Sequence, residues 1–248
     1  YHLLEDNGYK TLLVSRPRSC GYPPIMPEIV FENNPYLNQA LRLQLRDKEE
    51  MSELNHFCET FLVGSDQLFN ADLYYRFGEM ITLDWVTDNH KKIAYAASFG
   101  HSVFWGREEQ RAKMAHYMQK FDAFSVREDD GVDLAKEYFG VDAEWVLDPV
   151  FLCDKTHYLD LAENAGRKNM ERHIFSYILD PSDEKNGILS YCAERMSLQV
   201  ELYSEMLYKP TKEKLEAEQK KFVYELRQAR IEERLFSLLH SEFIVTDS

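Results

Sequence analysis

The segment KIAYAASFG, Lys92 to Gly100, is a run of small and apolar residues that breaks at a glycine. A run of this length bounded by a turn residue indicates a buried strand. Helical spacing follows over residues 107–121, and a second apolar run covers Ala123 to Val126. A helix over 129–139 and a third short run, Trp145 to Leu147, come next. Strands that alternate with helices at short intervals predict a parallel α/β sheet.

The same alternation continues on both sides of this segment. The other predicted strands cover residues 11–14, 61–63, 81–86, 173–179 and 198–203, and a short terminal strand begins at Phe243 and leads into the polar residues Asp247 and Ser248. The other predicted helices cover residues 37–57, 183–196, 212–228 and 230–239. Residues 15–36 contain five prolines and are expected to form an irregular loop. Residues 1–10 are typical of the last turns of a helix that stops at Gly8.

Between residues 150 and 170 the pattern loosens into polar, turn-rich sequence, which predicts a hinge or linker. The chain has 248 residues, enough for one large domain or two small ones. We therefore expect two Rossmann-like α/β units, residues 1–150 and 151–248. The chain opens in mid-helix and ends directly after a strand, and we interpret it as a fragment that lacks its first unit and its last.

The composition excludes several classes of partner. The chain has 29 basic and 43 acidic residues, so its net charge is −14. Such a surface repels nucleic acid and anionic membranes, and no apolar run is long enough for a transmembrane segment. The four cysteines are far apart and form no CxxC pair, which favours buried thiols in a cytoplasmic protein over a disulfide framework or a zinc site. No metal is expected, and a cysteine nucleophile remains the alternative.

Ligands of open parallel sheets bind at the carboxyl ends of the strands, so the residues just after predicted strands form the candidate site. These residues are Gly64, Ser65, Asp66, Ser98, His101, Arg127, Glu128, Asp148, Asp247 and Ser248. A glycine lets the backbone approach a ligand, a carboxylate accepts a hydroxyl proton, and a guanidinium holds a carboxylate or phosphate. Asp148 has a simpler alternative role, which is to end its strand.

Other candidates also have structural alternatives. Asp66 is a favoured cap for the helix that follows it. Arg127 is placed to form a salt bridge with Glu128 or Asp129, and His101 is a lone histidine in a loop that solvent can reach. The motifs GxGxxG, GxxxxGK[ST], HExxH and GxSxG are absent from the sequence. Composition and pattern alone therefore indicate only a two-part α/β protein with an acidic surface.

Five segments, taken in order, resemble the polysaccharide pyruvyl transferase family. They are FLVGSDQLFN (61–70), KIAYAASFG (92–100), FSVRE (124–128), VLDPV (146–150) and FIVTDS (243–248). The resemblance implies a fold similar to the two-domain, GT-B-like glycosyltransferases, with two Rossmann-like halves that face a cleft. It also implies the activity of characterised members, which transfer the enolpyruvyl-derived group of phosphoenolpyruvate to two sugar hydroxyls as a cyclic ketal in cell-surface polysaccharide biosynthesis.

The resemblance assigns roles to residues. It implies that Arg127 binds the anionic donor and that Asp66 orients or deprotonates a sugar hydroxyl. The other candidate residues are expected to contact substrate because they follow predicted strands. The family's histidine acid lies in a Ser-Phe-His-Gly or similar segment directly after Thr-Asp, so it would follow Ser248, and His101 does not match it. The expected partners are phosphoenolpyruvate, as co-substrate, and a saccharide or lipid-linked glycan acceptor, with no further cofactor. The alternatives are a glycan-binding domain that has lost catalysis and a sugar-nucleotide glycosyltransferase.

Overall fold

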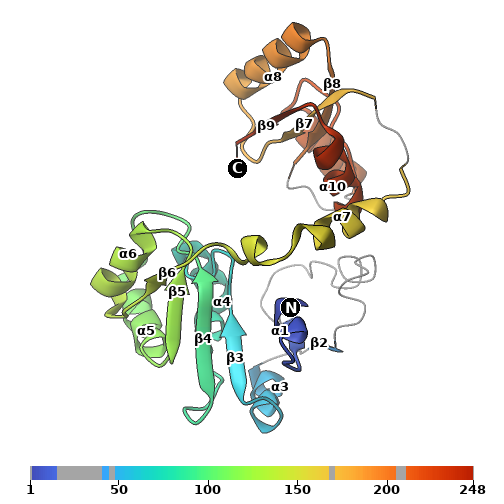
Figure 1. Ribbon diagram of the computed structural model, residues 1–248. Coiled ribbons are helices and arrows are strands. Elements are labelled where there is room, and N and C mark those ends of the chain that lie inside the picture. The colour runs from blue at the N-terminus through green and yellow to red at the C-terminus, as the bar shows by residue number, and fades with distance from the viewer. Residues whose placement is uncertain (1, 16–40, 45–47, 168–170, 205–210, 248) are drawn as a thin grey trace. The chain divides into compact units, whose positions relative to one another are not determined.

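The computed structural model describes residues 2–15, 41–44, 48–167, 171–204 and 211–247 (Figure 1). The chain divides into two compact units, Tyr1–Cys153 and Asp154–Ser248. The predicted boundary between residues 150 and 151 falls inside the 3-10 helix η3 (Pro149–Leu152). Ser248 and residues 16–36 of the predicted proline-rich loop lie outside the described residues. Within the described ranges, every helix is too short or too polar to cross a membrane.

The first unit is built on a four-stranded parallel sheet with the order β3-β4-β5-β6. Its strands are β3 (Thr60–Val63), β4 (Lys91–Ala97), β5 (Ala123–Val126) and β6 (Glu144–Trp145). A separate parallel pair joins β1 (Leu12–Ser15) to β2 (Leu41–Gln44). Because the four strands of the main sheet run in one direction, the residues that follow them gather at one edge (Figure 1).

Helices connect these strands. They are α1 (His2–Asp6), α3 (Lys48–Ser52), η1 (Glu53–His56), α4 (Ala71–Phe77), η2 (Gly78–Thr82), α5 (Glu108–Met118) and α6 (Asp130–Phe139), and η3 ends the unit. The side chain of Asp129 accepts a hydrogen bond from the Asp130 amide at the start of α6. The helix ends at Gly140, which adopts the left-handed conformation at φ 67°. A glycine in this conformation is a common end for a helix, because it has no Cβ to oppose the positive φ.

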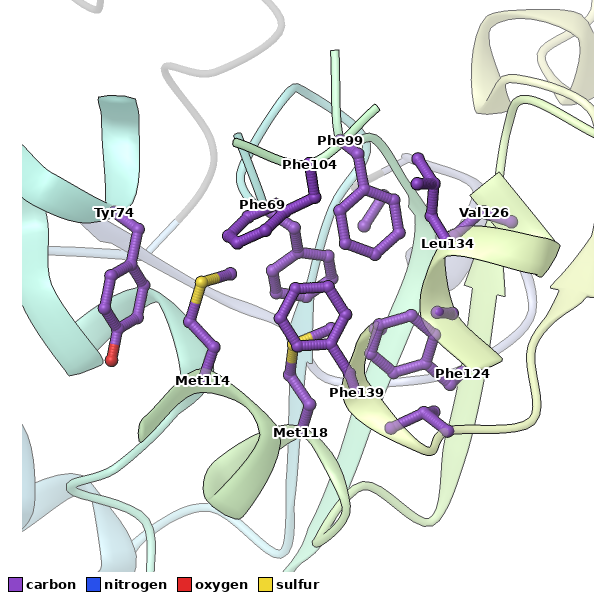
Figure 2. Close-up of a cluster of buried hydrophobic side chains, with 14 of the residues drawn as sticks. Phe69, Tyr74, Phe99, Phe104, Met114, Met118, Phe124, Val126, Leu134 and Phe139 are labelled. Carbon is purple, nitrogen blue, oxygen red and sulfur yellow. The ribbon is translucent and has the colours of Figure 1, made fainter. Parts of the chain in front are cut away.

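Buried aromatic rings and methionines fill the space between this sheet and helices α5 and α6 (Figure 2). Phe69 stacks on Phe124 with ring centroids 5.2 Å apart, and Phe99 stacks on Phe139 at 5.5 Å. Phe99 directly follows Ser98, so its buried ring anchors the exit from β4. Burying one such side chain is worth about 1.5–3 kcal/mol. The core therefore holds the backbone of the carboxyl edge in place.

The sheet carries a β-bulge close to this edge. Over the interval Ala94–Ala97, β4 advances one residue more than β5, and Ala96 has φ 50°. The Ala96 amide donates to the buried Oγ of Ser125 at 2.9 Å, and that hydroxyl donates to the Ala94 carbonyl at 3.2 Å. The Ser125 side chain thus satisfies the amide that the bulge removes from the ladder. The bulge bends β4 directly before Ser98.

The second unit contains a three-stranded parallel sheet with the order β8-β7-β9. The strands are β7 (His173–Tyr177), β8 (Gln199–Tyr203) and β9 (Phe243–Thr246), and the helices are α7 (Lys155–Glu163), α8 (Asp183–Met196), α9 (Lys212–Gln219) and α10 (Ile231–His240). Ile174, Leu189 and Leu202 are fully buried in the largest hydrophobic cluster of this unit. The parallel strands of both units confirm the predicted mixed α/β class.

Two predictions in the first unit are wrong. Residues 81–86 form no strand, because the amides of Leu83 and Val86 bond to carbonyls three residues back and Leu83 has φ 57°. The apolar alternation there reflects successive turns. The helix predicted over 37–57 is also wrong in its first part, since Leu41–Gln44 is a strand paired with β1. Its Leu-Arg-Leu-Gln alternation suits a strand.

Two predictions in the second unit are also corrected. The expected hinge at 150–170 contains helix α7, which is capped by the Asp154 carboxylate and buries Leu161. The helix predicted over 212–228 ends at Gln219, whose side chain accepts from the Leu226 amide at 2.7 Å. That side-chain bond ties the following loop back to the end of α9, so the charged sequence does not continue as a helix.

Candidate functional site

The exits of three neighbouring strands are joined by backbone hydrogen bonds. The Ser98 amide donates to the Asp66 carbonyl at 3.1 Å, and the Phe69 amide donates to the Ser98 carbonyl at 3.0 Å. The Arg127 amide donates to the carbonyl of Ala97, the last residue of β4, at 3.4 Å. The structure therefore brings the predicted residues Asp66, Ser98 and Arg127 together at the carboxyl edge of the sheet.

The Arg127 guanidinium is the centre of this edge. Its Nε donates to Glu128 Oε1 at 3.1 Å and its Nη1 donates to Asp148 Oδ2 at 2.9 Å. Its Nη2 lies 3.9 Å from Asp66 Oδ1, too far for a hydrogen bond, and the side chain is 26% exposed. Burial alone would lower the pKa of Arg127, but the bonds to Asp148 and Glu128 outweigh it and raise this pKa. The guanidinium is thus a fixed cation whose Nη2 faces the exposed Asp66.

Ser98 orients Glu128 from below the surface. Ser98 is fully buried, and its Oγ donates to Glu128 Oε1 at 2.8 Å. The same Oγ accepts from the Gly100 amide at 2.9 Å. A continuous chain of hydrogen bonds therefore runs from Gly100 through Ser98 and Glu128 to Arg127 and Asp148. Arg127 forms the predicted salt bridge with Glu128. It forms none with Asp129 among the described pairs, and the Asp129 side chain caps α6 instead.

The two aspartates of the cluster differ in exposure and in role. The Asp66 side chain is 84% exposed, and its Oδ1 accepts only from the neighbouring Gln67 amide, at 2.8 Å, among the hydrogen bonds that the structure describes. The helix-capping alternative for Asp66 is wrong, because Asn70 caps α4. Asp148 uses Oδ2 for Arg127 and Oδ1 for the Val150 amide at 3.0 Å. Asp66 is therefore the carboxylate that a ligand can reach most easily.

Gly64 and Ser65 lead from β3 into the Asp66 turn. Gly64 has φ 141°, and a Cβ at this position would lie 1.9 Å from the Tyr95 carbonyl oxygen. Only glycine fits such a close approach of two backbones. Ser65 is half-buried beside it. The backbone that approaches Gly64 closely is thus that of the neighbouring strand β4, and not that of a ligand. Ligand contact by Gly64 stays a prediction.

His101 is separate from the cluster. Its ring lies against Trp105, with centroids 4.1 Å apart, and the residue is exposed. Among the described side chains no hydrogen bond joins His101 to Arg127 or its carboxylates. The loop after β4 therefore carries an aromatic pair, and the predicted substrate contact of His101 remains untested.

In the second unit, Asp247 lies at the end of β9. Its carboxylate accepts from the amides of Leu179 and Asp180, at 2.8 Å and 3.0 Å, and from Lys185 Nζ at 2.7 Å. Burial alone would raise the pKa of Asp247, but these three donors outweigh it and lower this pKa. Asp247 closes the loop that follows β7, and substrate contact by this residue stays a prediction.

Sequence reasoning missed a cavity of about 780 Å³ in the second unit. Arg167, Tyr203 and Arg227 line it, and all three contact the buried carboxylate of Glu201. Burial alone would raise the pKa of Glu201, but bonds from Ser237, Arg167 and Tyr203 outweigh it and lower this pKa. No motif joins these residues, because they come from separate segments, so the sequence carries no local signal for the cavity.

The carboxyl edge of the first sheet can bind hydroxyl groups. Asp66, Glu128 and Asp148 are acceptors, and Arg127 is the only donor cation in this cluster of four residues, so the cluster has a net charge of −2. Carboxylates accept hydrogen bonds from neutral polyols, and an exposed one can take a hydroxyl proton. The arrangement therefore suits a hydroxylated substrate.

Comparison with known proteins gives one match. A sequence model of the polysaccharide pyruvyl transferase family matches residues 2–248, which is nearly the whole chain. No curated protein and no solved structure matches the chain.

Proposed function

The chain belongs to the polysaccharide pyruvyl transferase family, and on this premise we propose that it transfers a pyruvyl group from phosphoenolpyruvate to two hydroxyls of a saccharide. The product is a cyclic ketal on a cell-surface polysaccharide or its lipid-linked precursor. The observation that carries the proposal is the Asp66–Arg127–Asp148 cluster, which lies at the ligand-binding edge of a parallel sheet within the family match.

The proposed reaction proceeds in two additions at one carbon. A proton adds to the methylene carbon of phosphoenolpyruvate and leaves an oxocarbenium-like centre at the neighbouring carbon. One sugar hydroxyl attacks that carbon and loses its proton. Phosphate then leaves, the second hydroxyl attacks the same carbon, and its proton is released. The saccharide gains a ketal with a new methyl group, and one orthophosphate is formed.

Two residues have direct roles in this proposal. Asp66 is exposed, so its carboxylate can orient a hydroxyl and accept its proton. Arg127 is held by Glu128 and Asp148, and its Nη2 would bind the carboxylate or phosphate of the donor. Because the guanidinium is already held in place, binding of the donor has a smaller entropic cost. The proton for the methylene carbon is assigned to none of the described residues.

The cysteines support a cytoplasmic location for this reaction. Cys58, Cys153 and Cys192, the three cysteines within the described ranges, are free thiols. Free thiols are typical of reducing compartments such as the cytoplasm. The proposal places phosphoenolpyruvate in the same compartment.

A second function has one observation in its favour. Arg127 is already paired with two carboxylates, and the net charge of −2 at the cluster opposes an anionic donor. A neutral glycan meets no such opposition. The second candidate is therefore a domain that binds glycans without catalysis.

The complete gene product should be incubated with phosphoenolpyruvate and a panel of oligosaccharides, and orthophosphate release measured. We expect saccharide-dependent release, and a loss of at least about 100-fold in kcat/KM for Arg127→Ala, as for other groups that stabilise developing charge. Arg172→Ala is the matched control, since Arg172 is an exposed arginine paired with Glu242 in the second unit. Saturable glycan binding without phosphate release would instead support the binding domain, and cleavage of a nucleotide-sugar would indicate a glycosyltransferase.

A further inference from the structure

Two of the three tryptophans are exposed, and both follow or end strands of the same sheet. Trp85 is 7% exposed and packs edge-to-face on Phe61 at 5.2 Å. Trp105 lies in the loop after β4, and Trp145 is the last residue of β6 and 62% exposed. A large exposed aromatic ring next to a polar cluster is a common feature of binding surfaces.

The Trp145 ring is held against the backbone of Arg127. Its Nε1 donates to the Arg127 carbonyl at 3.2 Å, and the amide of the next residue, Val146, donates to the Val126 carbonyl at 2.9 Å. Asp148, which pairs with Arg127, lies three positions further on. Because the only polar atom of the indole is already bonded to the protein, the exposed part of the side chain is its apolar ring. The ring is therefore fixed in position and available for an apolar contact.

We propose that Trp145 is a stacking platform for one sugar ring of the acceptor. A pyranose combines a face of C–H groups, which packs on an aromatic ring, with hydroxyls at its edge, which bond to carboxylates. The structure supplies both partners, since the Trp145 indole bonds to the backbone of Arg127, and the Arg127 side chain lies among acceptor oxygens of Asp66, Glu128 and Asp148. The net charge of −2 at this cluster favours a neutral sugar over an anion. A docked protein needs no such group of solvent-accessible carboxylates.

This inference rests on the proposed function for its identification of the sugar as the acceptor, but sugar binding can be measured without catalysis. The complete gene product, labelled with ¹⁵N at tryptophan, gives one indole N–H signal for each tryptophan, and Trp145→Phe identifies the Trp145 signal by its loss. The probe is a panel of methyl glycosides of glucose, galactose, mannose and N-acetylglucosamine. We expect at least one glycoside to shift the Trp145 signal saturably while the buried Trp85 signal stays in place.

Kinetics with the same saccharide and phosphoenolpyruvate complete the test. Trp145→Ala should raise the acceptor KM about tenfold, the scale of one aromatic contact, and leave the donor KM within about twofold. Trp145→Phe should restore most of the affinity. The control is Phe57→Ala, which removes an aromatic side chain that is 79% exposed and precedes β3, at the amino edge of the sheet.

Two results separate this inference from the proposed function. A shifted Trp145 signal without phosphate release would support the platform and contradict the transferase. Phosphate release with an unshifted signal and an unchanged acceptor KM in Trp145→Ala would keep the transferase and overturn the platform. No shift with any glycoside, together with self-association that Trp145→Ala abolishes, would overturn it in favour of a protein-docking surface.

Discussion

Nη1 of Arg127 donates to Oδ2 of Asp148 at 2.9 Å, while the other oxygen of Asp148 accepts from the Val150 amide. The bond joins the exit of β5 to the start of η3, so one ion pair fixes two segments of the carboxyl edge. Arg127 is thereby both the cation of the candidate site and a connection between the loops that form it. A change at Arg127 should affect catalysis more than stability, because the pair is partly exposed.

The geometry of the guanidinium is expected to matter more than its charge. Arg127→Lys keeps the positive charge but cannot donate at once along the Nε and Nη1 directions that serve Glu128 and Asp148. We predict a loss of kcat of about tenfold or more, with the free energy of unfolding lowered by no more than about 1 kcal/mol. Steady-state phosphate release and urea unfolding measure the two quantities. Full activity in the lysine variant would show that only the charge is needed.

The buried hydroxyl of Ser98 should contribute to both stability and activity. Ser98→Ala leaves the Gly100 amide without this acceptor and Glu128 without this donor. We predict a loss of about 1–3 kcal/mol in the free energy of unfolding, the cost of unsatisfied buried groups. Phosphate release should also fall, because Glu128 then holds Arg127 less firmly. The control is Ser102→Ala, which changes an exposed serine in the same loop after β4 and should alter stability by less than about 0.5 kcal/mol. Equal stability of both variants would contradict the role of Ser98.

Gly64 should tolerate no side chain. In Gly64→Ala the new Cβ meets the Tyr95 carbonyl oxygen at 1.9 Å, and this oxygen belongs to the backbone of β4, which cannot move aside as a flexible side chain could. We predict a loss of more than about 3 kcal/mol or a failure to fold, measured by thermal or urea unfolding. The matched control is Gly187→Ala in helix α8, where a Cβ meets no atom within 4 Å and the helix should gain about 0.5–1 kcal/mol. A stable Gly64→Ala protein would show that the two strands are further apart.

Acid should weaken the second unit through Asp247. The pKa of Asp247 in the folded protein is lowered from its ordinary value of 3.8 by Lys185 and the two amides, against the effect of burial. The contribution of Asp247 to the free energy of unfolding is therefore complete above about pH 4. It is lost as the pH falls through the lower pKa of the folded protein. Asp247→Asn should unfold more easily than the wild type at pH 7, by about 1 kcal/mol, and the difference should shrink as the pH falls through the lowered pKa of Asp247. A difference that is independent of pH would contradict this linkage.

The elements with strong local signals are predicted to the residue or nearly so. Residues 183–196 begin after a capping serine and keep helical spacing, and the structure places α8 on Asp183–Met196. The run Ala123–Val126 is bounded by polar residues and is β5. The turns at 81–86 carry the sequence pattern of a strand, because alternation of apolar residues does not distinguish a strand from successive buried turns.

The candidate site is predictable in part for a physical reason. Parallel strands deliver their following residues to one edge, so Asp66, Ser98 and Arg127 can be grouped from the sequence. Their side-chain pairings cannot be predicted from the sequence, because the Ser98–Glu128 and Arg127–Asp148 bonds depend on strand register and on the bulge at Ala96. The position of the Trp145 indole against the Arg127 carbonyl depends on the same register.

The most direct test of pyruvyl transfer is to run the reaction of the complete gene product in deuterated water and examine the saccharide by NMR. The proposed route adds one solvent hydron to the methylene carbon of phosphoenolpyruvate. We therefore predict a ketal methyl group that carries one deuterium, with one orthophosphate released for each ketal. Arg127→Ala should produce neither product at a comparable rate. A folded wild-type protein that binds saccharide but forms no ketal, or a ketal whose methyl group carries no deuterium, would contradict the account.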